Sequence, residues 1–298
     1  MKPVELLLPA GNFEKMKYAF AFGADAVYLG IPRFSLRARQ NAFSRKDVFK
    51  AVAYARQLEK NVYITANIFP HNRKVQPFID YIDEFLQDCH PDAWIMSDPG
   101  MIMEMREKHP DQVIHLSVQA NTVNYMTVKF WDKIGIKRII LSRELSIEEI
   151  KQIRDQNPDI ELEAFVHGSI CIAYSGRCLL SNYLASRDPN QGTCPNSCRW
   201  KYQIYAKDSV QPDYFTDKNG HRIRTKTQHG DPYVELSDEY YLEELQRPGD
   251  LLPIDEDENG TYIMNSRDLC AIEYLEDLYR AGVNSFKVEG RTKSVYYE

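Results

Sequence analysis

The sequence predicts a closed (β/α)8 barrel of the TIM type, and three observations support that fold class. Eight short runs of almost continuously apolar residues alternate with amphipathic helical segments, as in a parallel sheet that is covered on both faces. A count of eight favours a closed barrel over an open, doubly wound sheet. No Gly-x-Gly-x-x-Gly follows any of these runs, so the usual sign of a dinucleotide-binding fold is missing.

The eight predicted strands follow one another along the chain, and each is near-continuously apolar, which is typical of buried parallel strands. Seven of them come before residue 167 and the eighth comes near the end of the sequence. The predicted strands are Glu5–Leu8, Ala26–Leu29, Val62–Ile68, Ala93–Met96, Val113–Val118, Arg138–Leu141, Glu161–Val166 and Ser285–Val288.

Amphipathic helices are predicted between the strands. Ser44 with Asp47 and Ser146 with Glu149 have the spacing of a capping box, which marks a helix N-terminus. After Ser44, apolar residues recur at the spacing of one helical face. The predicted helices are Asn12–Phe22, Ser44–Leu58, Val75–Gln87, a helix from Asp98 toward Lys108, Thr122–Ile134, a helix beginning at Ser146, and Asp268–Ala281.

A long insertion interrupts the seventh unit, because about a hundred residues separate the seventh strand from its helix. A loop of that length inside a compact domain is usually functional or forms a subdomain. The predicted division is therefore a barrel with strands 1–7 at residues 1–170, a cysteine-rich, β-containing insertion at 171–264, and helix 7, strand 8 and the start of helix 8 at 265–298. Since the insertion follows a strand, it lies at the C-terminal face, where barrel enzymes build their sites.

The composition limits the class of protein. The 298 residues carry a net charge of -6, so a nucleic-acid partner would need a local basic patch. No run approaches the roughly eighteen apolar residues of a membrane helix, and no signal peptide is present, so we expect a cytoplasmic protein without a membrane partner. In a reducing cytosol, the six cysteines favour metal binding or chemistry over disulfides.

Four of the cysteines are clustered in the insertion as Cys171-x6-Cys178 and Cys194-x3-Cys198, with fifteen residues between the pairs. Four thiolates suit tetrahedral zinc or an iron–sulfur cluster. The second pair fits the usual zinc spacing and the first does not, so the pattern favours an iron–sulfur cluster with zinc as the alternative. Spacing alone leaves open whether the metal is catalytic or structural. Cys89 and Cys270 stand alone in helical patterns and are predicted to be small buried residues.

Polar residues follow several predicted strands, at the end where barrel side chains point into the mouth. The candidates for catalysis are His167, Glu144 and Glu289, and the candidates for substrate binding are Asn67, His71, Gln119, Asn121, Arg143, Lys287 and Arg291. The arginines and the lysine would together suit a small carboxylate ligand. The alternative is that the two glutamates only pair with these cations.

Basic residues in the same loops allow an RNA contact surface despite the negative net charge. They are Arg33, Arg37, Arg39, Arg73, Lys74, Arg199 and Lys201. Solvated loop charge is the alternative explanation for each of them.

The cysteine segment also resembles a known signature. Glu163-x-Phe165-x-x-Gly168-Ser169-Ile170-Cys171, followed by Gly176-x-Cys178-x-Leu180-Ser181, is similar to the signature of the collagenase-like peptidase family U-32. Further segments, including SVQANTVNYMTVKFW, RDPNQGTCPNSCRW and KVEGRTKS, look like its TrhP-type branch, and this likeness covers essentially the whole chain. Proteins of that branch are longer, so a C-terminal extension is expected to be missing here.

The resemblance implies a function in RNA modification. Proteins of this branch support prephenate-dependent hydroxylation of the wobble uridine of tRNA to 5-hydroxyuridine. Their cluster cysteines match Cys171, Cys178, Cys194 and Cys198, which the resemblance implies to be ligands of a 4Fe-4S cluster. It further implies prephenate as co-substrate and tRNA as partner.

Three alternatives to this function are carried forward. A peptidase fits the family name, yet the sequence has neither His-Glu-x-x-His nor Gly-x-Ser-x-Gly. A Cys171–His167 nucleophile pair is conceivable, although a cluster ligand could not also be the nucleophile. A sister hydroxylation of ribosomal RNA or of a quinone precursor, or an iron–sulfur subunit that serves a partner protein, would use the same cysteines.

Overall fold

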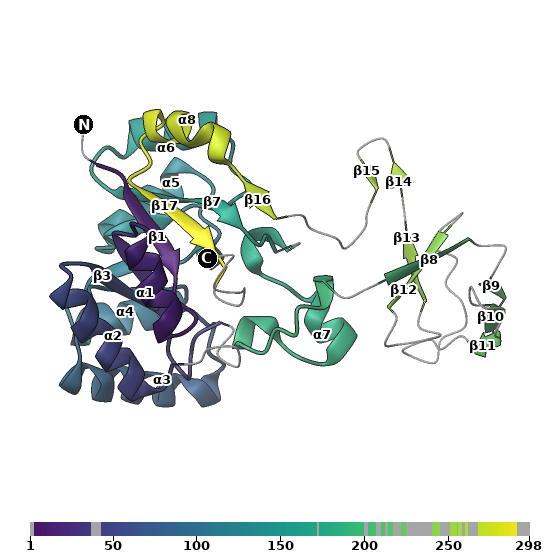
Figure 1. Cartoon of the computed structure of the whole chain (residues 1–298), viewed down its shortest axis with the longest axis horizontal. Coiled ribbons are helices and arrows are strands. Elements are labelled where there is room, and N and C mark those ends of the chain that lie inside the picture. The colour runs from purple at the N-terminus through teal and green to yellow at the C-terminus, as the bar shows by residue number, and fades with distance from the viewer. Residues whose placement is uncertain are drawn as a thin grey trace. The chain divides into compact units, whose positions relative to one another are not determined.

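The computed structural model describes residues 3–36, 43–171, 173–199, 202–206, 210–211, 214–216, 222–224, 240–244, 251–254, 256–257, 260–261 and 268–290. The chain divides into two compact units (Figure 1): Met1–Pro195 with Arg267–Glu298, and Asn196–Ser266. The first unit contains the barrel, and most of the described residues of the second lie in short strands.

Eight parallel strands within the described residues close into a ring, which confirms the predicted barrel. The ring runs β7-β17-β1-β2-β3-β4-β5-β6 and closes through pairing of β6 with β7. β17, the last strand of the barrel, lies between β1 and β7 and so pairs with the first strand of the chain (Figure 1). The strands are β1 (Glu5–Pro9), β2 (Ala26–Gly30), β3 (Asn61–Ala66), β4 (Ala93–Met96), β5 (Ile114–Leu116), β6 (Arg138–Ile140), β7 (Glu161–Gly168) and β17 (Ser285–Glu289).

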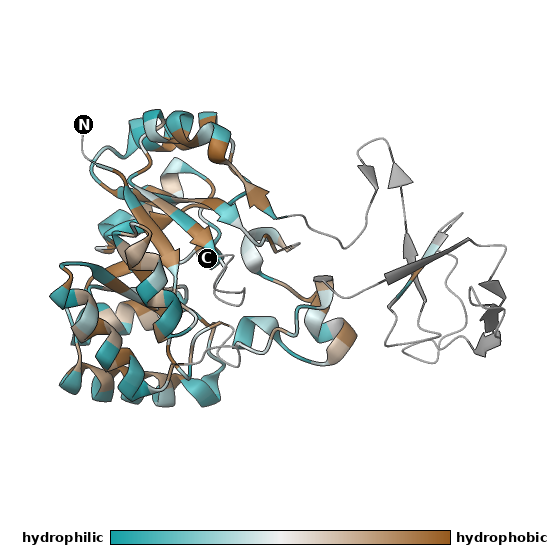
Figure 2. Cartoon of the chain, viewed as in Figure 1, coloured by the Kyte–Doolittle hydropathy of each residue, from teal (hydrophilic) through white to brown (hydrophobic). Residues whose placement is uncertain are grey.

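Helices connect consecutive strands and cover the outside of the ring. Both predicted capping boxes are present: Ser44 with Asp47 and Ser146 with Glu149 each exchange side-chain and backbone hydrogen bonds. The helices are α1 (Phe13–Ala21), α2 (Arg45–Gln57), α3 (Asn72–Asp88), α4 (Pro99–Lys108), α5 (Tyr125–Lys133), α6 (Ile147–Gln156) and α8 (Leu275–Arg280). Their sequence explains their position, since buried apolar residues such as Val48, Ala51 and Val52 of α2 recur at the spacing of one helical face. Hydrophilic and hydrophobic segments accordingly alternate along the helices in Figure 2.

Two hydrophobic clusters result from this arrangement. The larger one lies between strands and helices and includes Trp94, Phe85 and Met16. The smaller one includes Leu7, Tyr28, Tyr63, Ile95 and Phe165. Because side chains alternate along a strand, these residues point to the opposite face, into the barrel.

Charged side chains also fill the barrel interior at the end where the strands begin. The guanidinium of Arg138, the first residue of β6, lies 2.5 Å from the carboxylate of Glu5, 2.8 Å from Glu161 and 3.3 Å from Glu163. Burial alone would lower the pKa of Arg138, but Glu163 and Glu5 outweigh it and raise that pKa. Arg138 therefore stays charged inside the fold.

His115 on β5 faces the same interior. Its ring lies edge-on to Tyr63 at 4.6 Å, and its Nδ1 is buried with no hydrogen-bond partner among the described residues. Burial, followed by repulsion from Arg138 and Lys287, lowers the pKa of His115 well below its ordinary value of 6.5. The imidazole is therefore neutral in the folded protein.

A pH dependence of stability follows from His115. Below pH 6.5 the unfolded chain takes up a proton at this residue and the folded chain does not. The contribution of His115 to the free energy of unfolding is therefore fully present above pH 6.5 and is lost as the pH drops. The slope attributable to His115 is at most about 1.4 kcal/mol per pH unit. Urea unfolding of wild type and His115→Gln at pH 5 to 7 is expected to show a shallower slope in the variant. Equal slopes would contradict the burial of a neutral ring.

The helix predicted after the insertion was wrong in its bounds. Asp268–Ala281 is not one helix: Leu269–Cys270 forms β16, which pairs antiparallel with the end of β7, and only Leu275–Arg280 is α-helical. Backbone pairing with Gly168 and His167 prevails there over the helical pattern. As a consequence Cys270 is exposed, whereas Cys89 is buried as predicted.

Within the stretch inserted after β7, Cys171–Pro195 belongs to the barrel unit and the second compact unit starts at Asn196. Hydrogen bonds from the barrel loops hold the intervening segment in place. The second unit contains an antiparallel sheet of β8 (Tyr202–Ala206), β12 (Tyr240–Glu244) and β13 (Leu251–Ile254), with short pairings among β9 (Val210–Gln211), β10 (Tyr214–Thr216) and β11 (Arg222–Arg224), and between β14 (Glu256–Asp257) and β15 (Gly260–Thr261). In the part of the chain that the structure describes, no helix could span a bilayer.

Candidate functional site

Glu144, after β6, anchors the cysteine segment to the barrel. Its carboxylate accepts hydrogen bonds from the Ser175 backbone N–H at 2.6 Å and from the Ser175 hydroxyl at 3.0 Å. The Ser142 hydroxyl lies 2.7 Å from the same hydroxyl. Ser175 has a left-handed backbone with φ of 47°, a strained conformation for serine. Glu144 was a catalytic candidate, but its contacts are those of a positioning residue.

Gln119 makes a second connection to this segment, from the 3-10 turn η2 (Val118–Ala120) after β5. Its Nε2 donates to the Gly176 carbonyl at 3.2 Å, and the Arg177 Nε donates to the Gln119 carbonyl at 2.8 Å. Arg177 also stacks over the Phe69 ring at 4.6 Å. The Gln119 Oε1 and the Asn121 Oδ1 are buried, and neither has a hydrogen-bond partner among the described residues. The two amides at the end of β5 thus keep unused acceptors beside the cysteine segment.

Asn67 and His71, the candidates that follow β3, differ in position. Asn67 is buried, accepts from the Leu36 N–H at 3.1 Å and donates to the Ser117 hydroxyl at 3.4 Å. His71 is exposed at the start of α3 and makes no capping bond with its side chain. Asn67 therefore links the loops that contain Leu36 and Ser117, and these hydrogen bonds do not involve His71.

Arg143 and Glu289 meet at the barrel mouth. The Arg143 Nη1 donates to the Ser169 carbonyl at 3.3 Å, and its Nη2 lies 4.0 Å from the Glu289 carboxylate. The guanidinium stacks on the Phe165 ring, with a distance of 4.0 Å to the centroid. Gly168 allows the backbone of Glu289 to approach β7 this closely, because a Cβ there would lie 1.8 Å from the Glu289 carbonyl oxygen. The pair is of the kind that the alternative above describes, but at 4.0 Å it lies at the outer limit of an ion pair.

His167, the remaining catalytic candidate, is half-buried near the end of β7. Its backbone is in register with Val288 on one side and with Cys270 on the other. His167 therefore lies beside Gly168, which is in register with Glu289.

Lys287 does not belong to a cationic mouth, which corrects the prediction. It points into the barrel, is 4% exposed, and its Nζ donates to the Glu163 carboxylate at 2.7 Å. The ammonium also lies 4.3 Å from the centre of the Tyr28 ring. Alternation along β17 decides this, since inward and outward positions alternate in a barrel strand. Arg291, the other proposed cation, lies outside the described residues.

Glu163 and Arg138 are the interior residues that sequence reasoning missed as a group. The signal was available in β7, where Glu161 and Glu163 alternate with apolar residues in an otherwise buried strand. Carboxylates at every second position of such a strand indicate one polar interior face. A cation on a neighbouring strand is then required, because a buried charge needs a partner.

The cysteines divide between the two units: Cys171, Cys178 and Cys194 lie in the barrel unit, and Cys198 lies at the start of the other. No disulfide links the cysteines, all of which fall in the described part of the chain. Cys178 exchanges backbone hydrogen bonds with the Asn190 side chain, and the Ser181 hydroxyl lies 3.8 Å from the Cys194 sulfur. Among the described residues no group of three His, Cys, Asp or Glu side chains is arranged as a metal site. The iron–sulfur or zinc site stays a prediction.

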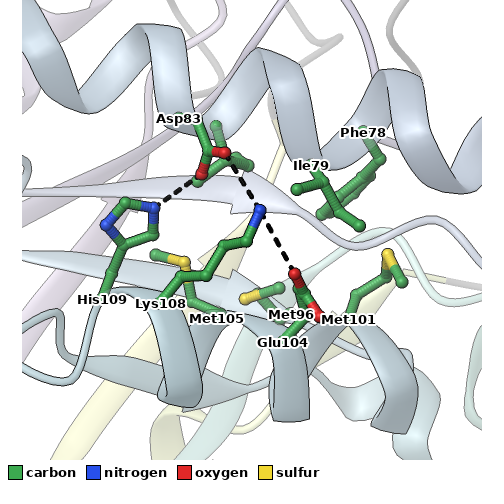
Figure 3. Close-up of a pocket in the computed structure, with 10 residues that line it drawn as sticks. Phe78, Ile79, Asp83, Met96, Met101, Glu104, Met105, Lys108 and His109 are labelled. Carbon is green, nitrogen blue, oxygen red and sulfur yellow. Dashed lines mark hydrogen bonds and ion pairs between the residues drawn. The ribbon is translucent and has the colours of Figure 1, made fainter.

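A hollow between α3 and α4 is too small to be a ligand site (Figure 3). Its volume is about 10 Å³, which is near the minimum for a single water. Asp83 lies 2.7 Å from the His109 ring and 3.2 Å from the Lys108 ammonium (Figure 3). The lining also includes methionine and phenylalanine side chains. Burial would raise the pKa of Asp83, but these hydrogen bonds outweigh it and lower that pKa. The group is a helix-to-helix contact.

The whole sequence from residue 11 to residue 298 matches the family described as peptidase family U32. The chain belongs to this family. A solved U32 peptidase matches with a TM-score of 0.56 and 12% identity, covering 97% of this chain and 93% of that chain. This likeness supports the U32 barrel as the fold.

Other U32 relatives carry names from RNA modification. tRNA hydroxylation protein P of Escherichia coli is 51% identical over 298 residues, which cover 98% of this chain and 65% of that protein. The Haemophilus influenzae protein of the same name is 50% identical, with 98% and 64% covered. A 23S rRNA 5-hydroxycytidine synthase of Escherichia coli is 31% identical, with 99% and 37% covered. The chain thus spans slightly less than two thirds of the tRNA hydroxylation proteins.

Proposed function

We propose that this chain acts in tRNA hydroxylation, converting the wobble uridine to 5-hydroxyuridine with prephenate as co-substrate. The observation that carries the proposal is identity of about one half, over nearly the whole chain, to two tRNA hydroxylation proteins. Hydroxylation replaces the hydrogen on the base carbon by a hydroxyl group, a two-electron oxidation that needs an oxygen donor and an electron path.

The cysteine segment offers a donor set that fits a 4Fe-4S cluster. Four cysteines that are not in disulfides provide the four thiolates that such a cluster takes. The residues that would hold the cluster are Cys171, Cys178, Cys194 and Cys198, as the resemblance implies. A bound cluster supplies one-electron transfer. Zinc would fit the thiolates equally in number and would supply none.

The barrel residues support this arrangement by fixing the cysteine segment over the strand ends. Glu144 holds Ser175 and Gln119 holds Gly176. These contacts come from two different barrel loops, and Asn190, within the segment, holds Cys178. Rigid support of this kind is what a reactive centre at the C-terminal face of a barrel requires.

The proposal is tested in a strain that lacks its own tRNA hydroxylation proteins. Expression of the full-length gene is expected to restore 5-hydroxyuridine derivatives at the wobble position, as measured by mass spectrometry of tRNA nucleosides. A block in prephenate synthesis is expected to abolish this gain. An unchanged nucleoside profile in the complemented strain would refute the proposal.

A sister activity on ribosomal RNA is the second candidate, since one relative is a 23S rRNA 5-hydroxycytidine synthase. The same strain distinguishes it, because hydroxycytidine in ribosomal RNA would rise while tRNA stayed unchanged. A peptidase is the third candidate. The family is described as a peptidase family, and a relative from Methanocaldococcus jannaschii, 34% identical, is named an uncharacterized protease. Casein cleavage by the wild type that is lost in Cys171→Ser would favour it.

A further inference from the structure

A cavity of about 290 Å³ lies between β6, α6, β7 and the segment from β16 to α8. Its walls are apolar and include the buried side chains of Leu141, Ile150, Ala164 and Leu278. An aliphatic cavity of about 150 Å³ is enough to hold a benzene ring. This cavity therefore has room for one ring together with a short polar substituent.

Of the described residues that line the cavity, Arg143 alone carries a charge. One face of its guanidinium is covered by the Phe165 ring at 4.0 Å, and its Nη1 is engaged by the Ser169 carbonyl. Its Nε is buried and has no hydrogen-bond partner among the described residues, and its Nη2 is 4.0 Å from Glu289, the outer limit of an ion pair. The Nε–Nη2 edge is thus the part of Arg143 that the protein leaves unsatisfied. Two parallel N–H groups on one edge match the two oxygens of a carboxylate.

The N-terminus of α6 borders the same cavity through Ser146 and Ile147 but does not supply an anion site. Its capping box already binds the backbone N–H groups of Ser146 and Glu149. The carboxylates of Glu148 and Glu149 in the same turn would repel an anion. A ligand anion is therefore directed to Arg143 and not to the helix end.

Ile170 lines the cavity, and the next residue is Cys171. A ligand in the cavity would thus contact the chain immediately before the first cysteine of the cluster set. Tyr274 lies at the lining and is about half exposed, which places it at the opening to solvent.

We propose that this cavity binds a small carboxylate with a hydrophobic body of about the size of one ring, oriented by Arg143. As the assignment of the co-substrate site, this inference rests on the proposed function, but carboxylate binding is measured without RNA or cluster. The Phe165 ring stacks on the guanidinium, and most of the other lining side chains are apolar, so the charge pair would form in surroundings of low polarity. Both effects strengthen recognition of a carboxylate over an uncharged analogue.

The test is calorimetric titration of the purified 298-residue chain with phenylpyruvate and with its methyl ester. Wild type is expected to bind the acid more tightly than the ester. Arg143→Met is expected to weaken binding of the acid by about tenfold to a hundredfold and to leave the ester unchanged. Arg280→Met, which removes an exposed arginine of α8 that pairs with Glu276, is the matched control and is expected to bind as wild type does.

Two further variants keep the test decisive if Arg143→Met is poorly folded. Ala271→Leu fills the cavity from a residue whose backbone N–H is held by the Val166 carbonyl, and it is expected to weaken both probes. Glu289→Gln removes the competing carboxylate and is expected to tighten binding of the acid. Unchanged affinity in Arg143→Met and Ala271→Leu would overturn the proposal. Failure of the tRNA assay with intact carboxylate binding would refute only the proposed function.

Discussion

Cys178→Ser is expected to yield a colourless protein that has lost its iron, and tRNA without wobble hydroxyuridine in the complemented strain. The wild type, purified without oxygen, is expected to be brown and to hold about four irons per chain. Serine differs from cysteine only in the atom that would bind iron. Because Asn190 holds both the backbone N–H and the carbonyl of Cys178, the backbone is expected to keep its position in the variant. The measurement is iron and sulfide content together with absorption in the blue.

Cys270→Ser is the matched control for this experiment. Cys270 is an exposed thiol on β16, outside the proposed ligand set, so the variant is expected to retain iron and colour. A colourless wild-type protein with one zinc per chain would contradict the cluster. Iron retained in Cys178→Ser would exclude Cys178 as a ligand.

Glu163→Gln is expected to destabilise the barrel unit by about 3–5 kcal/mol, the range for breaking a buried ion pair. Glu163 is fully buried and lies 2.7 Å from the Lys287 ammonium and 3.3 Å from the Arg138 guanidinium. Without its carboxylate, Lys287 is left as a buried cation with no negative partner at hydrogen-bond distance among the described residues. The loss is measured by urea unfolding at neutral pH.

The double variant Glu163→Gln with Lys287→Met is expected to recover part of this loss, because the uncompensated ammonium is gone. Lys50→Met is the surface control, since Lys50 is exposed and lies 3.9 Å from Asp47. It is expected to change the unfolding free energy by no more than about 0.5 kcal/mol. A cost for Glu163→Gln as small as that of Lys50→Met would contradict a structural role for the interior pair.

Sequence periodicity predicted the strands well because each parallel strand is buried on both faces. Continuous apolar runs such as Ala93–Met96 have no other stable place in a folded chain. The capping boxes at Ser44 and Ser146 were equally local, since donor and acceptor lie three residues apart. The attachment of residues 171–195 to the barrel unit is not determined by local pattern. It depends on contacts of Ser175 and Gly176 with loops more than thirty residues away, on β5 and β6.

The candidate site was only partly predictable for the same reason. The position of a residue after a strand predicts that it lies near the mouth, and this holds for Gln119, Glu144 and Arg143. It does not predict its partner. Glu144 binds a backbone N–H instead of a cation, and Lys287 turns inward to Glu163.

The sequence by itself determined the number and order of the barrel strands, the clustering of four cysteines after the seventh, and membership of the U32 family. These properties are written in residue types and short spacings. Only the tertiary structure decided which charges face each other inside the barrel, which loops hold the cysteine segment, and that a cavity lies beside Arg143. Closure of the ring brings β6 and β17 against β7, and no local pattern specifies which side chains then meet.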